Sequence, residues 1–356
     1  MGGTDRQRSR SRERLERLST SSLDCESSQR EAVAELQRLI GFERWCWPLA
    51  DPTTLLPLGG VADHDYGPGV SRALELEYSG GDFAAKDVLA RRLSPAGCLS
   101  AETGGDLARS PRWDQVLRAA GIGDIAVVPC RDAHGCWGWM EAYRDRGDQP
   151  FREEDLEFLG SVASSLGTAL RRGLGVVPQA SEDMPEAGSG VIVLDADLRV
   201  RTMTAGARIW IGAFPLAEVF AAWGMLPAVV YPLATRARAG AGVAQAQALD
   251  RVCDGRWVKI EAARLEGLED GEIAVTLREA TASEMFQRRC RMFGLSSRER
   301  EVVAALVAGS DTRAVTERLF VSAHTVQDHL KSVFGKMGIH SRREMLAMFS
   351  AWQDKG

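Results

Sequence analysis

Polar side chains near the carboxyl end of the chain have types and spacing suited to hydrogen bonding with DNA bases. Four of them, His324, Gln327, Asp328 and Lys331, recur at steps of one or three residues, and Gly335 follows four residues later. At about 100° per residue they share one face of a helix, and Val326, Leu330, Val333 and Met337 share the other. A carboxamide, a carboxylate and an ammonium match the major-groove edges of adenine, cytosine and guanine. A plain solvated helix face has the same pattern, so this alternative stays open.

The helix that carries these residues belongs to a run of short helices with clear end signals. Four residues are suited to capping a helix amino terminus, namely Ser296, Asp311, Ser322 and Ser341. Glu299 and Glu344 follow two of them at capping-box spacing, and Gly309 and Gly338 can end helices in a left-handed conformation. Between Leu319 and Ser322 only a tight turn fits, which predicts a helix-turn-helix.

This region resembles a known family. The segments LSSREREVV, GSDTRAVTERLFVSAHTVQDHL and KMGIHSRREML resemble, in order and spacing, the four-helix DNA-binding domain of LuxR-type transcription factors over residues 294–356. Thr316 stands where the family usually has Ala, and Ala314 where it often has Glu. Gln327 and Asp328 also depart from the usual basic or amide pair, which bears on the DNA sequence read more than on the fold.

The resemblance implies roles for single residues. It implies that Gln327, Asp328 and Lys331 face bases. It places four residues near DNA phosphates: Arg318, Ser322, Thr325 and His329. The last helix presents Met345, Leu346, Phe349 and Trp352 as a dimer or core face. The family implies a homodimer on double-stranded DNA, whereas helix periodicity alone favours a core role for that face.

The composition indicates a globular protein of two or three domains. The chain has 356 residues, 45% of them hydrophobic. Nothing resembles a signal peptide, and the most apolar long run, residues 213–234, contains three prolines and Glu218. A membrane-spanning helix would tolerate these poorly, so we expect a soluble cytoplasmic protein without membrane contact. Seven cysteines without regular spacing fit a reducing compartment.

Charge is distributed unevenly along the chain. From Arg291 to the end there are ten basic and seven acidic residues, a net charge of +3, although the whole chain carries −5. The candidate DNA-binding part is therefore the positive part. Because +3 is modest for a DNA-binding domain, we expect one copy to bind weakly and a second copy to be needed.

The amino-terminal residues 1–27 are polar and rich in arginine, with few apolar residues in their first 22 positions. Such a segment cannot bury a core of its own, so we expect a disordered tail. Two interpretations are open, a solvated tail and a nonspecific contact with phosphates.

Residues 28–172 have a globular pattern that resembles a GAF domain, a family of sensor modules. The segment opens with a helix carrying Val33, Leu36 and Ile40. Near its end, two strands are joined by a turn at Asp132–Gly135, and a helix follows from Arg152. The motif PFREEDLEFL, which starts this helix, carries most of the resemblance. Residues 50–112 give only weak strand and helix signals.

Two groups in this segment could bind a ligand. Cys130, His134 and Cys136 form a C-x3-H-x-C pattern, but the spacing matches no common zinc site, so packing positions are favoured over metal ligands. Five tryptophans could line a small-molecule pocket or fill an ordinary core, which is the more frequent role: Trp45, Trp47, Trp113, Trp137 and Trp139. The sequence identifies no metal, no cofactor and no ligand-binding residue.

The remaining segments complete the domain organisation. Residues 173–187 read as a linker, residues 188–280 resemble a PAS domain with strands at both ends, and residues 281–293 form a connector helix. Asp195 fits a turn better than a phosphoacceptor, since no acidic cluster accompanies it. The expected fold is therefore multidomain α+β, with two α/β sensor-type domains followed by an all-α four-helix helix-turn-helix domain.

These observations favour a sequence-specific transcriptional regulator whose DNA-binding head responds to a small molecule or a partner sensed by the preceding domains. RNA polymerase or a regulatory protein stays open as a further partner. An enzyme, such as a nucleotide hydrolase or cyclase, is disfavoured because no phosphate-binding glycine loop, HExxH motif or nucleophile elbow occurs. Protein contact through the helix-turn-helix is the other alternative.

Overall fold

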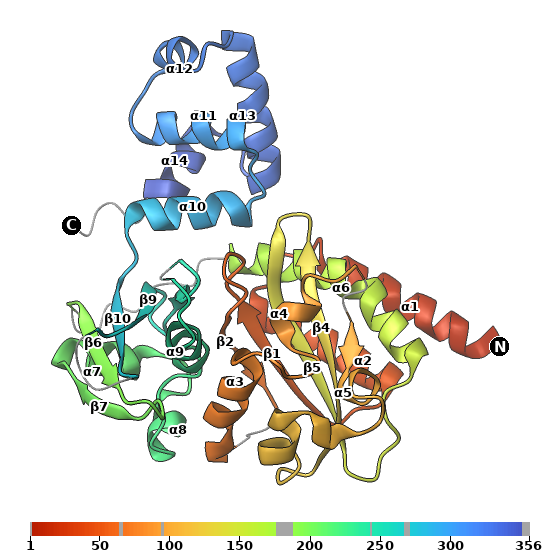
Figure 1. The fold of residues 1–356 in the computed structure, drawn as a ribbon. Coiled ribbons are helices and arrows are strands. Elements are labelled where there is room, and N and C mark those ends of the chain that lie inside the picture. The colour runs from red at the N-terminus through yellow and green to blue at the C-terminus, as the bar shows by residue number, and fades with distance from the viewer. Residues whose placement is uncertain are drawn as a thin grey trace. The chain divides into compact units, whose positions relative to one another are not determined.

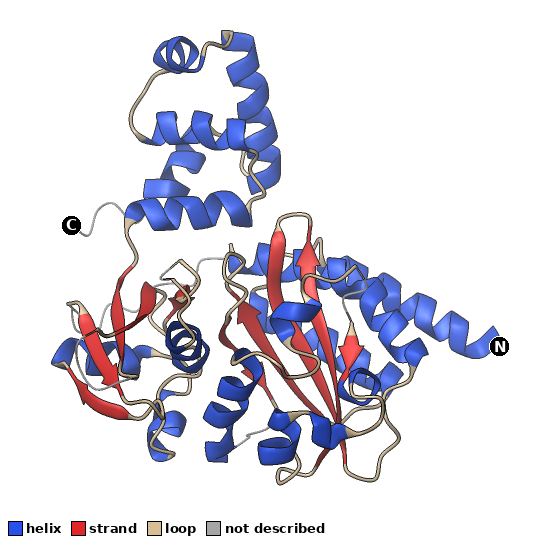
Figure 2. Cartoon of the chain, in the orientation of Figure 1, coloured by secondary structure: helices blue, strands red, loops and turns tan. Residues whose placement is uncertain are grey.

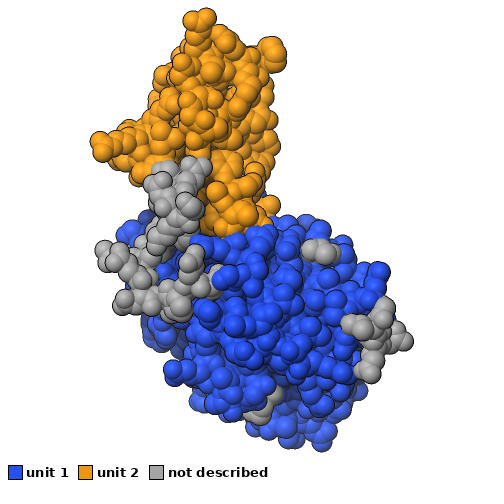
Figure 3. All heavy atoms as spheres, turned by 90° about the vertical axis from the view of Figure 1, so that its left-hand side faces the viewer, with its two compact units in different colours: residues 1–279 blue, residues 280–356 orange. Residues whose placement is uncertain are grey.

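A computed structural model describes residues 2–63, 67–93, 96–175, 188–242, 244–266 and 271–350. The chain divides into two compact units, Met1–Glu279 and Ala280–Gly356 (Figure 3). The first unit combines strands and helices, whereas the described part of the second is helical (Figure 2). Among the described residues, no helix has the length and apolar character that crossing a membrane requires.

The first unit contains two antiparallel sheets (Figure 1). The first sheet comprises β1 (Arg44–Ala50), β2 (Pro57–Ala62), β3 (Gly97–Cys98), β4 (Ile122–Asp132) and β5 (Gly135–Asp145), in the order β2-β1-β5-β4-β3. Strands β4 and β5 form a hairpin in which Asp132 pairs with Gly135, which confirms the turn predicted from the sequence. Strands β2 and β3 form the two edges of this sheet.

Two long helices pack near the β4–β5 hairpin, α2 (Cys25–Ile40) and α6 (Glu153–Leu174). Helix α6 comes so close to β4 that a Cβ atom at Gly167 would lie 2.7 Å from the backbone of Arg131. A side chain at this position would therefore force the helix away from the strand. Asp24 caps α2 by accepting a hydrogen bond from the backbone N–H of Ser27.

The expected disordered tail is wrong for most of its length, because Gly2–Leu18 form helix α1. Its apolar side chains Leu15 and Leu18 are buried, and Ser11 donates a hydrogen bond of 2.6 Å to Glu35 on α2. These three residues lie on one face of the helix, and the arginines lie mostly outside it. A few well-spaced residues are thus enough to dock an arginine-rich helix on a neighbour.

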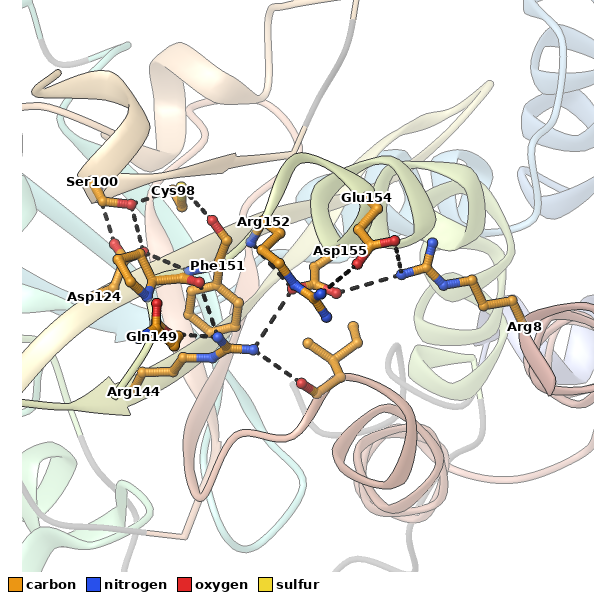
Figure 4. Close-up of polar contacts among 12 residues, drawn as sticks. Arg8, Cys98, Ser100, Asp124, Arg144, Gln149, Phe151, Arg152, Glu154 and Asp155 are labelled. Carbon is orange, nitrogen blue, oxygen red and sulfur yellow. Dashed lines mark hydrogen bonds and ion pairs between the residues drawn. The ribbon is translucent and has the colours of Figure 1, made fainter. Parts of the chain in front are cut away.

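The start of α6 is held by a buried carboxylate and a half-buried guanidinium that Figure 4 shows together. Asp124 on β4 accepts hydrogen bonds from the backbone N–H groups of Ser100, at 2.9 Å, and Phe151, at 3.0 Å. Arg144 on β5 lies over the ring of Phe151, 4.4 Å from its centre, and donates hydrogen bonds to the backbone carbonyls of Gln149, Pro150 and Ile40. Arg8 of α1 lies 3.6 Å from Asp155 in the first turn of α6. This cluster fixes the β5–α6 connection and docks α1 beside it.

Residues 50–112, where sequence signals are weak, form short elements. They include α3 (Val70–Tyr78), α4 (Lys86–Leu89) and α5 (Leu99–Glu102), two 3-10 turns (Gly67–Gly69 and Leu107–Arg109), and they lead into a π-helical turn at Trp113–Leu117. A buried ionic network joins them to the sheet, since Lys86 lies 2.7 Å from Glu77 and also contacts Glu141 on β5. Arg112 lies 3.0 Å from the same Glu77. These charges compensate one another inside the protein, which a buried ion requires.

Seven of the eight ligand candidates of this segment are buried in the structure. All five tryptophans predicted as core or pocket are buried, with at most 9% of any side chain exposed. Cys130 and Cys136 are buried and His134 is exposed at the hairpin turn. In the described ranges, no three His, Cys, Asp or Glu side chains gather as metal ligands do.

The second sheet of the first unit has the same strand order as the first. It comprises β6 (Gly190–Leu194), β7 (Val200–Met203), β8 (Gln247–Arg251), β9 (Trp257–Arg264) and β10 (Ile273–Glu279), in the order β7-β6-β10-β9-β8. Helices α7 (Ala205–Ala213), α8 (Ala217–Ala222) and α9 (Val230–Arg238) lie between β7 and β8 in the chain. The predicted linker 173–187 lies mostly outside the described residues, and α6 extends into it as far as Leu174.

Polar contacts link the two sheets directly. Asp250 on β8 accepts a hydrogen bond of 3.0 Å from the backbone N–H of Gly59 on the edge strand β2. On α9, Arg238 lies 2.6 Å from Glu75 of α3. Strand β2 therefore lies beside the second sheet, which explains why the two sheets belong to one compact unit.

The second unit contains α10 (Ala282–Met292), α11 (Ser297–Val307), α12 (Thr312–Leu319), α13 (Ala323–Met337) and α14 (Arg342–Ser350). The connector helix expected at 281–293 is thus α10, but it is part of this unit and not a bare spacer. Its Cys290 is fully buried in the core of the unit, and the ring of Phe286 lies 5.2 Å from that of Phe349 on α14.

Candidate nucleic-acid interface

Helices α11, α12 and α13 begin at the capping residues that the sequence predicted. Ser296 forms a capping box with Glu299, while Asp311 and Ser322 each accept a hydrogen bond from the backbone N–H three residues ahead. Gly338 ends α13 in the left-handed conformation, with φ of 68°. Ser341 also accepts from the N–H of Glu344, at 3.2 Å. These end signals are confirmed.

Helix α13 buries one face in the core of the unit. Its buried residues are Val326, Leu330, Val333 and Met337, as the periodicity predicts. They pack with Val302, Val303 and Leu306 of α11, and with Val315 of α12. The packed face leaves the opposite face of α13 to the solvent.

A buried carboxylate joins α13 to α11. Glu299 is 4% exposed, and its carboxylate accepts hydrogen bonds from Ser332, at 2.7 Å, and from Lys336, at 2.6 Å. Burial raises the pKa of Glu299, but the hydrogen bonds from Lys336, Ser332 and Ser296 outweigh it and lower the pKa to about 2. One carboxylate therefore caps α11 and sets the position of α13. The sequence indicated the cap and did not indicate the contact with α13.

The three residues predicted to face bases lie together on the exposed side of α13. Gln327, Asp328 and Lys331 are all exposed. The carboxylate of Asp328 lies 3.6 Å from the imidazole of His324 one turn earlier, and this is an ion pair only when the histidine is protonated. In the part of the second unit that the structure describes, Lys331 forms no ion pair. Its ammonium and the Gln327 carboxamide are free to meet a ligand.

The four residues predicted near phosphates differ in their exposure and in their contacts with the rest of the protein. Arg318, at the end of α12, is exposed and forms no ion pair with any described residue. The hydroxyl of Ser322 caps α13, and it lies 2.9 Å from the hydroxyl of Thr325. Thr325 and His329 are half-buried. Of these four residues, Arg318 therefore has the side chain most available for a contact with phosphate.

The turn between α12 and α13 contains an exposed residue that the sequence did not single out. Phe320 ends α12 in the left-handed conformation, with φ of 54°, and 93% of its surface is exposed. No glycine marks this turn, so composition gave no sign of a left-handed residue. Thr316, a departure from the usual family pattern, lies within α12. Its hydroxyl donates a hydrogen bond of 2.7 Å to the Arg313 carbonyl and is therefore satisfied within the helix.

The last helix places two of its four predicted residues in the core. Met345 and Phe349 are buried, Leu346 is half-buried against them, and Trp352 lies outside the described residues. Arg342 donates a hydrogen bond of 2.8 Å to the Ser310 carbonyl and so ties the start of α14 to the connection between α11 and α12.

Comparison with known proteins agrees with this geometry. Residues 294–349 match the family described as bacterial regulatory proteins, luxR family, and residues 24–170 match the GAF domain. A putative HTH-type transcriptional regulator in the exeN 3'region of Aeromonas salmonicida is 38% identical over 55 residues, which are 15% of this chain and 28% of that protein.

A second relative is covered over most of its length. The spore germination protein GerE of Bacillus subtilis (strain 168) is 36% identical over 50 residues, which are 14% of this chain and 68% of that protein. The family match at residues 294–349 covers the helices whose caps, core and exposed face are described above. Through this carboxy-terminal region, the chain belongs to the luxR family of bacterial regulatory proteins.

Proposed function

We propose that the chain is a sequence-specific transcriptional regulator that binds double-stranded DNA through α13 and is controlled by the sensor domains of its first unit. One observation carries the proposal. Helix α13 presents Gln327, Asp328 and Lys331 to the solvent on the face opposite its buried residues, and Glu299 holds that helix in place. A helix fixed by its core face and polar on its free face suits the major groove.

In this proposal the exposed residues divide the work between sequence and position. Gln327, Asp328 and Lys331 contact base edges, and Arg318 contacts a phosphate together with the hydroxyl and imidazole groups of Ser322, Thr325 and His329. Contacts with phosphates set the register of the protein on DNA, whereas contacts with bases select the sequence. The support for this division is the exposure of the first set and the position of the second, with Arg318 at the end of α12, Ser322 at the start of α13, and Thr325 and His329 on α13 itself.

We also propose that two copies of the chain bind together. The net charge of +3 from Arg291 onward supplies few phosphate contacts for tight binding by one copy. Leu346 and the end of α14 are our candidates for the surface between copies, since Leu346 is only partly buried in its own unit. Two copies would read two half-sites related by a twofold axis.

The first unit is the sensing part in this proposal. Its residues 24–170 match the GAF domain, and we propose that residues 188–280 form a second, PAS-like sensor domain. The support is their sheet, which has the same strand order as the GAF-matched sheet. A signal bound here would alter the availability of α13, by a difference in affinity between two states of the chain.

The test is a binding selection with the full chain on random double-stranded DNA, followed by titration of the selected site over a range of salt. The proposal expects one enriched motif, with affinity that falls linearly on a log-log plot against salt concentration. Affinity that does not change with salt, or a selection without an enriched motif, would contradict it.

A further inference from the structure

A cavity in the first unit belongs to neither sheet alone. Its volume is about 430 Å³, and it lies between the edge strand β2 and the segment that runs from the end of α7 to the start of α9. Small-molecule pockets in proteins span about 300–1,000 Å³ and are frequent where domains meet. The size and the place of this cavity are those of a ligand site.

The walls of the cavity are mostly apolar. They include Leu58, Phe214, Pro215, Val219, Phe220 and Trp223. Helix α8 supplies Val219 and Phe220, yet none of its residues is buried, and Leu216 just before it is 59% exposed with φ of 60°. An apolar helix held open to solvent costs free energy that a bound apolar molecule would recover.

The polar groups of the cavity are two carboxylates, Asp63 and Asp250. Both accept hydrogen bonds from backbone N–H groups: Asp63 from Trp45 at 2.7 Å, and Asp250 from Gly59 at 3.0 Å and from Arg251 at 2.8 Å. In the described residues no lysine or arginine lines the cavity. Two negative charges beside apolar walls favour a ligand that donates hydrogen bonds or carries positive charge, and they disfavour an anion.

A second cavity beside the first sheet is less suited to such a ligand. It measures about 100 Å³, and Glu77, Lys86 and Glu141 of the buried ionic network line it. An aromatic molecule there would have to displace paired buried charges, and separating a buried ion pair is strongly unfavourable. The larger cavity can be filled without breaking any of these pairs.

We propose that the cavity between β2 and α8 binds a small aromatic molecule that is uncharged or cationic and has a hydrogen-bond donor for Asp63 or Asp250. Such a ligand would contact the edge strand of one sheet and a helix of the other domain at once. This names a ligand class for the sensing half of the proposed function and rests on that function only for its regulatory meaning. The binding itself can be measured without DNA.

The probe for the test is N-phenyl-1-naphthylamine, an uncharged aromatic amine whose fluorescence rises in apolar surroundings. Titration of the full chain should give saturable binding of one probe per chain. Anilinonaphthalene sulfonate has the same ring system with an anionic group, and we expect it to bind at least tenfold more weakly. Absence of saturable binding, one probe per two chains, or tighter binding of the sulfonate would overturn the proposal.

A matched pair of variants locates the site. Val219→Glu puts a carboxylate on the cavity wall and should weaken binding of the amine probe at least tenfold. Val200→Glu on β7 is the control, since Val200 is 41% exposed, close to the 38% of Val219, and does not line the cavity. Equal affinity of the two variants would overturn the assignment.

Two further measurements keep the outcome decisive. Phe220→Ala removes an aromatic wall from a helix without buried residues, so the fold should persist and the affinity should fall about fivefold or more. Asp63→Asn should reduce the ratio of the affinity for the amine probe to the affinity for the sulfonate probe. An unchanged affinity ratio would refute the role of that carboxylate. If the DNA selection succeeds but the probe does not bind, this inference is overturned and the proposed function is not.

Discussion

At the scale of single residues, Gln327 is the clearest test of sequence reading. Its carboxamide is exposed on α13 and can pair with an adenine edge. We expect Gln327→Ala to lower the affinity for the selected DNA site by about 1–3 kcal/mol and to leave the affinity for random DNA nearly unchanged. Fluorescence anisotropy with both DNAs at one salt concentration measures the two affinities.

The matched control for this substitution is Gln287→Ala. Gln287 is an exposed glutamine of the same unit, on α10 and not on α13. It should change neither affinity. Equal losses on selected and random DNA for Gln327→Ala would assign this residue to nonspecific contact.

Residues also show where sequence reasoning reached its limit. The exposed face of α13 was predictable, because helical periodicity depends only on the spacing of apolar residues. The left-handed Phe320 was not predictable, because its conformation is imposed by the packing of α12 and α13 and not by a residue that favours it. Glu299 was predicted as a cap, but its bonds with Ser332 and Lys336 join positions more than 30 residues apart.

At the scale of elements, the position of α13 on α11 should depend on pH through Glu299. The pKa of this carboxyl is about 2 in the folded unit, below its ordinary value of 4.5. A lowered folded pKa adds stability above pH 4.5, and this stability is lost as the pH falls from about 4.5 towards 2. We expect Glu299→Gln to lower the free energy of unfolding at pH 7 by about 1–3 kcal/mol.

Thermal or urea unfolding of the second unit between pH 2 and 7, followed by circular dichroism, checks this expectation. The variant should lack the part of the pH dependence that Glu299 supplies. Glu301→Gln is the control on the same helix, because Glu301 is exposed and its ion pair with Arg298 is a surface pair of small energy. A pH profile unchanged by Glu299→Gln would refute the role assigned to this carboxylate.

Helix α1 gives a second test at this scale. Leu15 is 1% exposed where α1 packs on its neighbours, so Leu15→Ala should lower the free energy of unfolding of the first unit by about 2–4 kcal/mol. Leu93→Ala is the control, since Leu93 is fully exposed. A disordered tail predicts no difference between the two variants in urea unfolding, and that result would remove α1 from the folded unit.

The elements that the sequence predicted are those with a periodic apolar pattern of sufficient length. The β4–β5 hairpin, α2 and α6 have such a pattern and match the structure closely. Short elements such as α4 and α5, of four residues each, are set by tertiary contacts, among them the buried pair of Lys86 and Glu77. Helix α1 was missed because its buried positions are few among many arginines.

At the scale of the whole molecule, the two sheets of the first unit lie side by side. The sequence pattern of one chain segment cannot show a contact between two sheets that are far apart in the chain. The contact of Asp250 with Gly59 joins residues 191 positions apart. The GAF-matched segment could be predicted from local patterns, but the cavity between β2 and α8 arises only where the two sheets meet. The most testable ligand site therefore lies where sequence analysis found no candidate.

Charge sets the last expectation at this scale. With +3 from Arg291 onward against −5 for the whole chain, one copy gains little from phosphates and is opposed by its own acidic part. Two copies on one DNA molecule double the contacts, and each adds its own base-reading helix. The full chain should therefore bind two inverted half-sites, about 10 base pairs apart between centres or a multiple of this, much more tightly than one half-site.

A mobility-shift titration with matched DNA molecules measures this difference. One DNA carries both half-sites, a second has one of them scrambled, and a third has 5 base pairs inserted between them, about half a helical turn. We expect scrambling to weaken binding about 100-fold or more, and the insertion to weaken it to a similar extent, because it turns the second half-site to the opposite side of the DNA. Equal affinity for all three DNAs would show that one copy suffices, and the net charge of the head would then not limit its binding.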